Sequence, residues 1–212
     1  MTSVPHSFGG NVNDVLLATL ARAVRSWQAD RGLDDDAPVT ILSEGHGRYE
    51  DVVEAGPNPR RADLSRTVGW FTTIAPVAVD PAVDVVHAVK AAKEARLATP
   101  DHGVGFGLLR YGAESPLATR PLPSIAFNYL GNRGGAGVDD QATATIARSS
   151  QVDAWLPAGD APFLPSTIDG AMPAMATLTI NASTAPGPEG RVLSAEFRFA
   201  QRIVSDDDVR DI

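Results

Sequence analysis

The 212-residue sequence contains no cysteine. Disulfide bonds, thiol catalysis and cysteine-ligated metals are therefore excluded, and nothing points to an oxidising compartment. The N-terminus has no basic segment followed by an apolar core, so it does not resemble a signal peptide. No apolar run reaches the length of a membrane span. These absences predict a cytoplasmic chain with no membrane partner.

The sequence also has fewer basic than acidic residues. The 18 lysines and arginines are outnumbered by 26 acidic residues, which gives a net charge of -8 and argues against nucleic acid as a partner. The four histidines, His6, His46, His87 and His102, lack the spacing of metal ligands. No Gly-x-Ser-x-Gly segment supports serine-hydrolase chemistry. What is present, 43% hydrophobic and 21% charged residues, is typical of a globular chain that buries a core.

Periodicity of the apolar residues predicts alternating helices and strands. A helix capped by Asn11 and stopped by Gly32 is followed by a strand, an extended segment and a second helix. The pattern as a whole predicts an α/β fold with a mixed β-sheet flanked by helices. The predicted segments are the strands Val39–Glu44, Ile125–Leu130, Ala176–Ser183 and Val192–Ala200, the extended segment Val68–Val79, the helix Val83–Leu97 and a short helical piece around Leu108–Tyr111.

Several of these segments carry more detailed expectations. Segment 68–79 should be largely buried, with Pro76 marking an edge or a bend. In the second helix we expect Val86 and Val89 to face inward and Lys90, Lys93 and Arg96 to lie on a solvated face. The short helical piece should pack on the sheet through Leu108, Leu109 and Tyr111, and the last two strands should form a hairpin.

The final third of the chain holds two irregular features. Residues Asn132 to Ala174 are rich in Gly, Ala, Pro and Asp and form a long excursion that needs a special explanation, such as a crossover onto another body. Ser205 and Asp208 predict a helix N-terminus, yet the sequence ends at Ile212. This pattern leads us to expect a truncated final helix.

The segment Glu44-Gly45-His46-Gly47-Arg48 is the strongest candidate for chemistry. Alternation along the preceding strand places Glu44 on the face of Leu42, near a core. A carboxylate there is costly unless it is paired or partly neutral, and a raised pKa suits it to proton transfer. The two glycines allow a sharp turn. The alternative is an ordinary strand exit in which Glu44 pairs with Arg48.

Five motifs in order along the chain resemble one family. They are Asn13-Asp14-Val15-Leu16-Leu17, Glu44–Arg48, Arg66–Thr72 (Arg-Thr-Val-Gly-Trp-Phe-Thr), Gly103–Tyr111 (Gly-Val-Gly-Phe-Gly-Leu-Leu-Arg-Tyr) and Phe127-Asn128-Tyr129-Leu130-Gly131. Together they resemble the epimerization domain of nonribosomal peptide synthetases, a branch of the condensation-domain superfamily with a fold like chloramphenicol acetyltransferase. Condensation domains proper carry a different motif where Glu44–Arg48 stands.

The resemblance implies that residues 1–212 form the C-terminal lobe of such a domain. The N-terminal lobe of the family carries a His-His-x-x-x-Asp-Gly motif, and the present sequence contains no adjacent histidines. We therefore expect that lobe to be absent and the isolated chain to be inactive. A segment of the C-terminal lobe in this family crosses onto the other lobe, which makes residues 132–174 its plausible counterpart.

The implied activity converts an L-aminoacyl or peptidyl residue to the D form by removal and return of its Cα proton. Glu44 is the implied acid/base residue, and Asn128 and Tyr129 are implied to line the site; in a regular strand these two face opposite ways, so only one can reach the substrate directly. Arg48 either pairs with Glu44, which we favour, or positions it, and His46 either braces the loop or transfers protons. The implied partner is a peptidyl carrier protein that holds the substrate on its phosphopantetheine arm, with no cofactor bound directly by this chain.

The sequence also departs from the family pattern. Tyr49 stands where an acidic residue is usual, and Ala75 replaces an aromatic residue often found before Pro76. Trp70 and Phe71 are expected in the core or the tunnel wall. Two alternatives to the epimerase are a peptide-bond-forming condensation lobe and a non-catalytic docking remnant.

Overall fold

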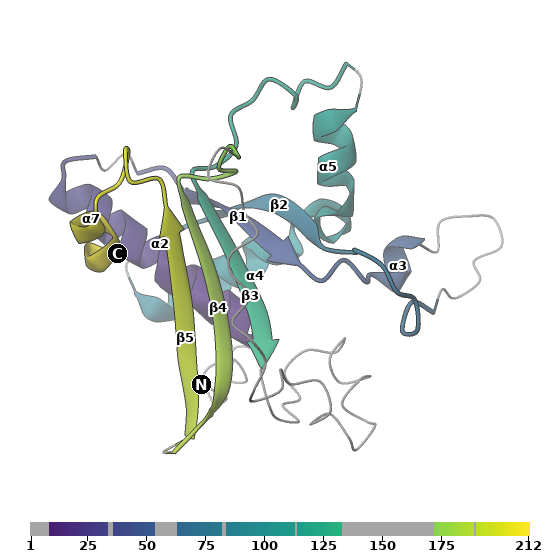
Figure 1. Cartoon of the computed structure of the whole chain (residues 1–212), viewed down its shortest axis with the longest axis horizontal. Helices are drawn as coiled ribbons and strands as arrows, with labels where there is room; N and C mark the ends of the chain where they lie inside the picture. The colour runs from purple at the N-terminus through teal and green to yellow at the C-terminus, as the bar shows by residue number, and fades with distance from the viewer. Residues whose placement is uncertain are drawn as a thin grey trace.

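The computed structural model describes residues 9–33, 36–53, 63–81, 84–112, 114–132, 172–188 and 190–212. This part of the chain forms both helices and strands, and the last three strands follow one another in the order of the described elements (Figure 1). The helical segments are α2 (Val12–Asp30), α3 (Glu50–Val53), α4 (Val85–Leu97), the 3-10 helix η1 (Pro100–Gly103), α5 (Val104–Tyr111) and α7 (Asp206–Asp211). The strands are β1 (Val39–Gly45), β2 (Thr73–Val79), β3 (Ile125–Asn132), β4 (Leu178–Gly187) and β5 (Gly190–Phe199).

The five strands form one mixed sheet in the order β2-β1-β3-β4-β5. The central pairs β1–β3 and β3–β4 are parallel, and the outer pairs β1–β2 and β4–β5 are antiparallel. The predicted α/β class with a mixed sheet and flanking helices is confirmed. The predicted hairpin of the last two strands is also confirmed, with Gly187 opposite Gly190 at its turn. Pro76 lies in β2, an edge strand, as expected of a proline.

The main core lies between one face of the sheet and the helices α2 and α4 (Figure 1). Apolar side chains recur every three or four residues on α2 and on alternate positions of the strands, so both periodicities converge on this layer. Its fully buried members include Leu17, Ala21, Ile41, Val79 and Val89. In the described part of the chain, the opposite face of the sheet carries a smaller apolar cluster of Leu42, Ala126 and Ala176, with Ile74 and Leu122 packed against it. This second face therefore has room for polar side chains.

The two helices are tied together by a buried ion pair. Asn11 and Asp14 form the predicted capping box at the start of α2, with each side chain accepting a hydrogen bond from the other's backbone N–H. The Asp14 side chain is completely buried, and Arg96 from α4 donates to both of its carboxylate oxygens, at 2.6 and 3.2 Å. The expectation that Arg96 belongs to a solvated basic face is therefore wrong.

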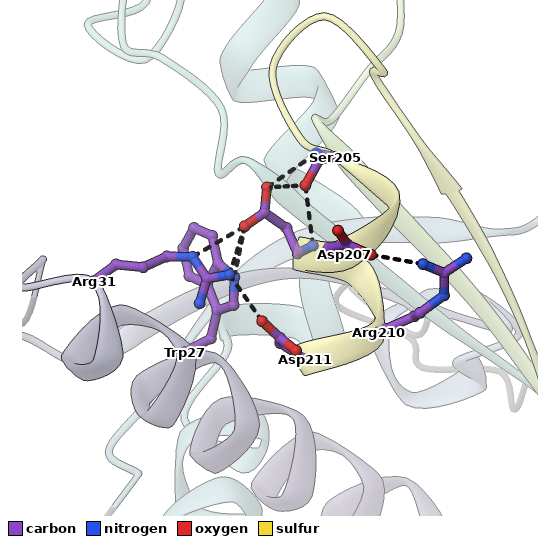
Figure 2. A network of polar contacts seen from close by, with 7 residues as sticks. Trp27, Arg31, Ser205, Asp207, Arg210 and Asp211 are labelled. Atoms are coloured by element: carbon purple, nitrogen blue, oxygen red, sulfur yellow. Dashed lines mark hydrogen bonds and ion pairs between the residues drawn. The ribbon is translucent and has the colours of Figure 1, made fainter.

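The last helix docks on the first through polar contacts (Figure 2). Ser205 caps α7 in the predicted capping box with Asp208, and Arg31 at the end of α2 donates to both Asp208 and Asp211. The indole N–H of Trp27 also donates to Asp208. Hydrogen bonds from Ser205, strengthened by the nearby Arg31 cation, lower the pKa of Asp208 to about 2. These contacts join residues almost 180 positions apart along the chain.

Some burial predictions were wrong. Strand β2 begins only at Thr73, and Val68 and Trp70, predicted to be buried, are 99% and 92% exposed. Val86 in α4 is exposed, whereas Val89 is buried as expected. Helix α5 forms where a helical piece was predicted, but Leu108, Leu109 and Tyr111, which were predicted to pack on the sheet, are exposed. A lone apolar residue near a helix start or in a loop has no periodic neighbours to fix the face it presents.

One further expectation lies mostly beyond the residues described, and one concerns membrane spans. The excursion 132–174 falls almost entirely outside the described residues, which leaves its crossover role a prediction. None of the helices in the described residues combines the length and apolar character needed to cross a membrane.

Candidate functional site

Glu44 stands at the end of β1 on the sheet face that the main helices leave open. It is opposite Ile74 of β2 and two residues beyond Leu42, whose side chain is on the same face. Partial burial raises the pKa of the Glu44 carboxyl above its ordinary range. Throughout the described ranges, no residue forms a hydrogen bond or an ion pair with this carboxylate. Glu44 therefore combines the properties expected of a general acid or base: partial burial, a raised pKa and an available proton site.

The predicted pair between Glu44 and Arg48 is not found among the described residues. Arg48 instead donates from Nη1 to the carbonyl oxygen of Leu64 at 2.6 Å, and its guanidinium lies 4.3 Å from the centre of the Phe71 ring. These contacts direct Arg48 toward the segment that precedes β2. Arg48 therefore holds the loop, and burial alone perturbs the pKa of Glu44.

A tight backbone approach explains the second glycine of the motif. Gly47 has a φ of +69°, a left-handed conformation that side chains disfavour. A Cβ atom at this position would lie 1.4 Å from the backbone oxygen of Phe71. His46 also braces the turn, because its Nδ1 accepts the backbone N–H of Arg48 at 3.0 Å. The bracing role considered for His46 is thus present in the structure.

Three aromatic rings pack beside this loop. The Tyr49 ring contacts His46, with centroids 4.4 Å apart, and stacks on His102 at 4.2 Å. Asp51 lies 3.2 Å from Nε2 of His102, and Thr73 donates to the His102 carbonyl. Sequence reasoning missed His102 and Asp51 because the two are 51 positions apart and neither lies in a motif with the other. Only the fold of η1 back onto α3 brings them together.

Asn128 and Tyr129 face opposite sides of the sheet, as strand alternation predicts. Ser43 of β1 is opposite Phe127 of β3, where the pairing of these two parallel strands ends. Extending that register by one residue puts Glu44 beside Asn128 on the open face. Tyr129 packs against the main core, and its hydroxyl lies 3.0 Å from the Thr184 hydroxyl. Asn128 is therefore placed beside Glu44, whereas Tyr129 packs on the opposite face of the sheet, against the main core.

Several known proteins are similar to this chain in sequence. No model of a known protein family matches the sequence. Chondramide synthase cmdD of Chondromyces crocatus is 46% identical over 129 residues, or 60% of this chain and 3% of that protein. A linear gramicidin synthase of Brevibacillus parabrevis is 36% identical over 153 residues, 69% of this chain and 3% of the relative. These relatives are nonribosomal peptide synthetases. The chain thus spans only a few per cent of their length.

Solved structures of similar fold include a synthetase epimerization domain. The epimerization domain from the third module of tyrocidine synthetase B has a TM-score of 0.67 and 25% identity, covering 98% of this chain and 40% of that one. The X-domain from teicoplanin biosynthesis (TM-score 0.56, 17% identity, 97% and 40% covered) shares the fold. So does PapA2 acyl transferase (TM-score 0.54, 14% identity, 97% and 37% covered). The resemblance to the synthetase epimerization domain and the chloramphenicol-acetyltransferase-like fold are confirmed.

Proposed function

We propose that this chain is the C-terminal lobe of a synthetase epimerization domain. In this proposal it acts together with an N-terminal lobe that carries the family's histidine motif, and it works in the cytoplasm. The 40% coverage of the tyrocidine synthetase epimerization domain supports a match to one lobe of a two-lobe body. The substrate is an aminoacyl or peptidyl thioester carried on the phosphopantetheine arm of a peptidyl carrier protein. The reaction inverts the Cα of the residue next to the thioester, from L to D.

The chemistry requires two proton transfers on opposite faces of one carbon. The Cα–H bond next to a thioester carbonyl breaks, its electron pair forms an enolate, and a proton is then delivered to the other face. Each transfer needs a positioned acid or base, and the enolate oxygen needs hydrogen-bond donors. A single carboxylate serves one face only. The proposal assigns that face to Glu44 and the other to the histidine motif of the partner lobe.

The single observation that carries the proposal is the state of Glu44. The Glu44 carboxyl is partly buried, has a raised pKa and lacks partners among the described residues. Such burial costs folding free energy, and carboxyls with a perturbed pKa cluster at functional sites. Asn128, its neighbour on the open face, offers an amide N–H₂ group that suits the stabilisation of a developing oxyanion. Arg48 and His46 keep the loop in place and are not assigned a proton.

Replacement of Glu44 by glutamine tests the assignment. With the N-terminal lobe supplied, Glu44→Gln should lower Cα proton exchange by ~10²–10⁴-fold, the usual contribution of a general acid or base. The matched control is Glu196→Gln, which removes a carboxylate from the same sheet face. Glu196 is already neutralised by Arg198 at 2.9 Å, so this variant should keep the exchange rate.

The outcomes separate the alternatives. Exchange is followed by mass spectrometry as Cα deuterium uptake from deuterated water. A Glu44→Gln variant with the wild-type rate would leave Glu44 without a catalytic role. Formation of a peptide bond without Cα exchange by the wild-type protein would favour the condensation lobe, and carrier-protein binding with neither reaction would favour a docking module.

A further inference from the structure

A row of polar side chains crosses the open face of the sheet beyond Glu44. Asn128 of β3 is opposite Asn181 of β4, and Asn181 is opposite Glu196 of β5. Directly opposed residues on neighbouring strands share one face, so these side chains continue the line that Glu44 begins. The row therefore consists of a carboxyl on β1, an amide on each of β3 and β4, and a second carboxyl on β5.

The carboxyl at the far end of the row is already satisfied. Arg198, two residues along β5, donates from Nε and Nη2 to the two Glu196 carboxylate oxygens, at 2.9 and 3.2 Å. This bidentate pair neutralises Glu196. The groups left to interact with a ligand are therefore Glu44 and the two amides.

Asn181 has no evident structural task. Asparagine is depleted in β-strands, where β-branched and aromatic residues pack better. Its flanking residues on β4, Ile180 and Ala182, fill the main core from the opposite face. The Asn181 amide is half-buried and makes no hydrogen bond with any residue in the described part of the chain. An amide that has no partner in the described part of the chain and is half-exposed is free to hydrogen-bond a ligand.

We propose that Asn181 is a further substrate-binding residue, which hydrogen-bonds a secondary amide of the thioester substrate and takes no part in the proton transfers. The inference rests on the proposed function. Neighbouring strands lie ~4.8 Å apart, so Asn181 stands about 10 Å from Glu44, two strand spacings along the row. An asparagine amide donates and accepts at once, which matches the C=O and N–H of a secondary amide.

Two parts of the substrate carry such an amide. One is the peptide bond upstream of the residue whose Cα reacts, present in a peptidyl substrate and absent from an aminoacyl one. The other is an amide of the phosphopantetheine arm, present in both. The chemistry recognised is the same, so aminoacyl and dipeptidyl substrates on one carrier protein distinguish the two sources.

The test replaces Asn181 with valine, which removes the amide and suits a strand. The matched control is Thr179→Val, which removes a hydroxyl from the same strand and the same face, two residues earlier, without changing the shape. Both variants are assayed with the N-terminal lobe supplied, by Cα deuterium uptake at varied carrier-protein concentration. We expect Asn181→Val to lower kcat/KM by about 3- to 10-fold, the size of one neutral hydrogen bond, and Thr179→Val to leave it unchanged.

Stability is the second measurement, because a merely structural asparagine would behave differently. Asn181→Val should unfold at the same urea concentration as the wild type or at a higher one, since valine has the greater β-propensity. A loss of kcat/KM with the dipeptidyl substrate only identifies the peptide amide, and a loss with both substrates identifies the arm. Wild-type kcat/KM with both substrates would overturn the proposal, as would a rate loss accompanied by a lower unfolding midpoint.

A binding measurement separates this proposal from the proposed function. A non-hydrolysable analogue, in which an amide replaces the thioester of a dipeptidyl phosphopantetheine, is titrated calorimetrically into the two-lobe protein. If the wild type binds the analogue but shows no Cα exchange, the epimerase assignment fails, and Asn181 is judged on Kd alone. A Kd that is unchanged in Asn181→Val, or absent binding by the wild type, overturns the Asn181 proposal.

Discussion

Replacement of Arg96 by alanine would leave a buried carboxylate without its cation. Asp14 is fully buried and accepts three hydrogen bonds, two from Arg96 and one from the backbone N–H of Asn11. Arg96→Ala removes two of the three and all of the compensating charge. Because Asp14 belongs to α2 and Arg96 to α4, the change also weakens the junction of the two helices that cover the main core.

The expected cost follows from the burial of the two groups. Loss of one partner of a buried ion pair typically lowers the free energy of unfolding by about 3–5 kcal/mol. The Arg96 side chain is 27% exposed, so water can reach part of the site once the guanidinium is gone. We therefore expect the low end of this range, about 3 kcal/mol. Urea unfolding followed by circular dichroism measures the difference.

A second substitution checks the cause. Asp14→Asn in the Arg96→Ala background removes the unpaired charge and keeps an oxygen for the Asn11 N–H, so it should recover part of the lost stability. Lys90→Ala, on an exposed position of the same helix, should change the free energy of unfolding by less than about 0.5 kcal/mol. A cost below about 1 kcal/mol for Arg96→Ala, or no recovery in the double variant, would refute the charge-burial argument.

Two further predictions concern the candidate site. Gly47→Ala should lower the free energy of unfolding by more than about 1 kcal/mol, because its Cβ meets the Phe71 backbone. The control is Gly105→Ala, which has open space around its Cβ. Equal effects of the two substitutions would contradict the claim that a side chain at Gly47 is strained. Glu44→Gln should make the protein more stable at neutral pH. The raised pKa of Glu44 means that its contribution to stability is full below the ordinary carboxyl pKa and is lost as the pH rises through the folded-state value. A difference in unfolding free energy between wild type and Glu44→Gln that does not change from pH 4 to pH 7 would contradict this.

The sequence predicted elements well where periodicity was long. The stripe of α2 and the alternation of β1, β3, β4 and β5 each fix which side chains are buried, so both the elements and the main core could be predicted. Capping boxes at Asn11 and Ser205 were equally legible, because each lies within four residues. The exposure of Val68 and Trp70 could not be predicted, because no repeating pattern fixes which face these residues present.

The candidate site was predicted in part. Glu44 on the face of Leu42 followed from alternation, and so did the divergence of Asn128 and Tyr129. The partners of Arg48 could not be predicted in this way. Leu64 and Phe71 contact Arg48 through a loop whose path no local rule specifies. The alignment of Asn128 with Asn181 depends on the register of two parallel strands that are distant in the sequence, which strand periodicity alone does not give.

The most direct measurement of the central claim is Cα deuterium uptake by a carrier-bound L-aminoacyl thioester in deuterated water. The account predicts enzyme-dependent uptake, together with appearance of the D form, when this chain and the N-terminal lobe are both present. With this chain alone it predicts no D form, because Glu44 serves one face of the carbon only and inversion needs a proton delivered to the other face. Formation of the D form by this chain alone would contradict the division of the proton transfers between two lobes, and no uptake by the complete pair would contradict the epimerase.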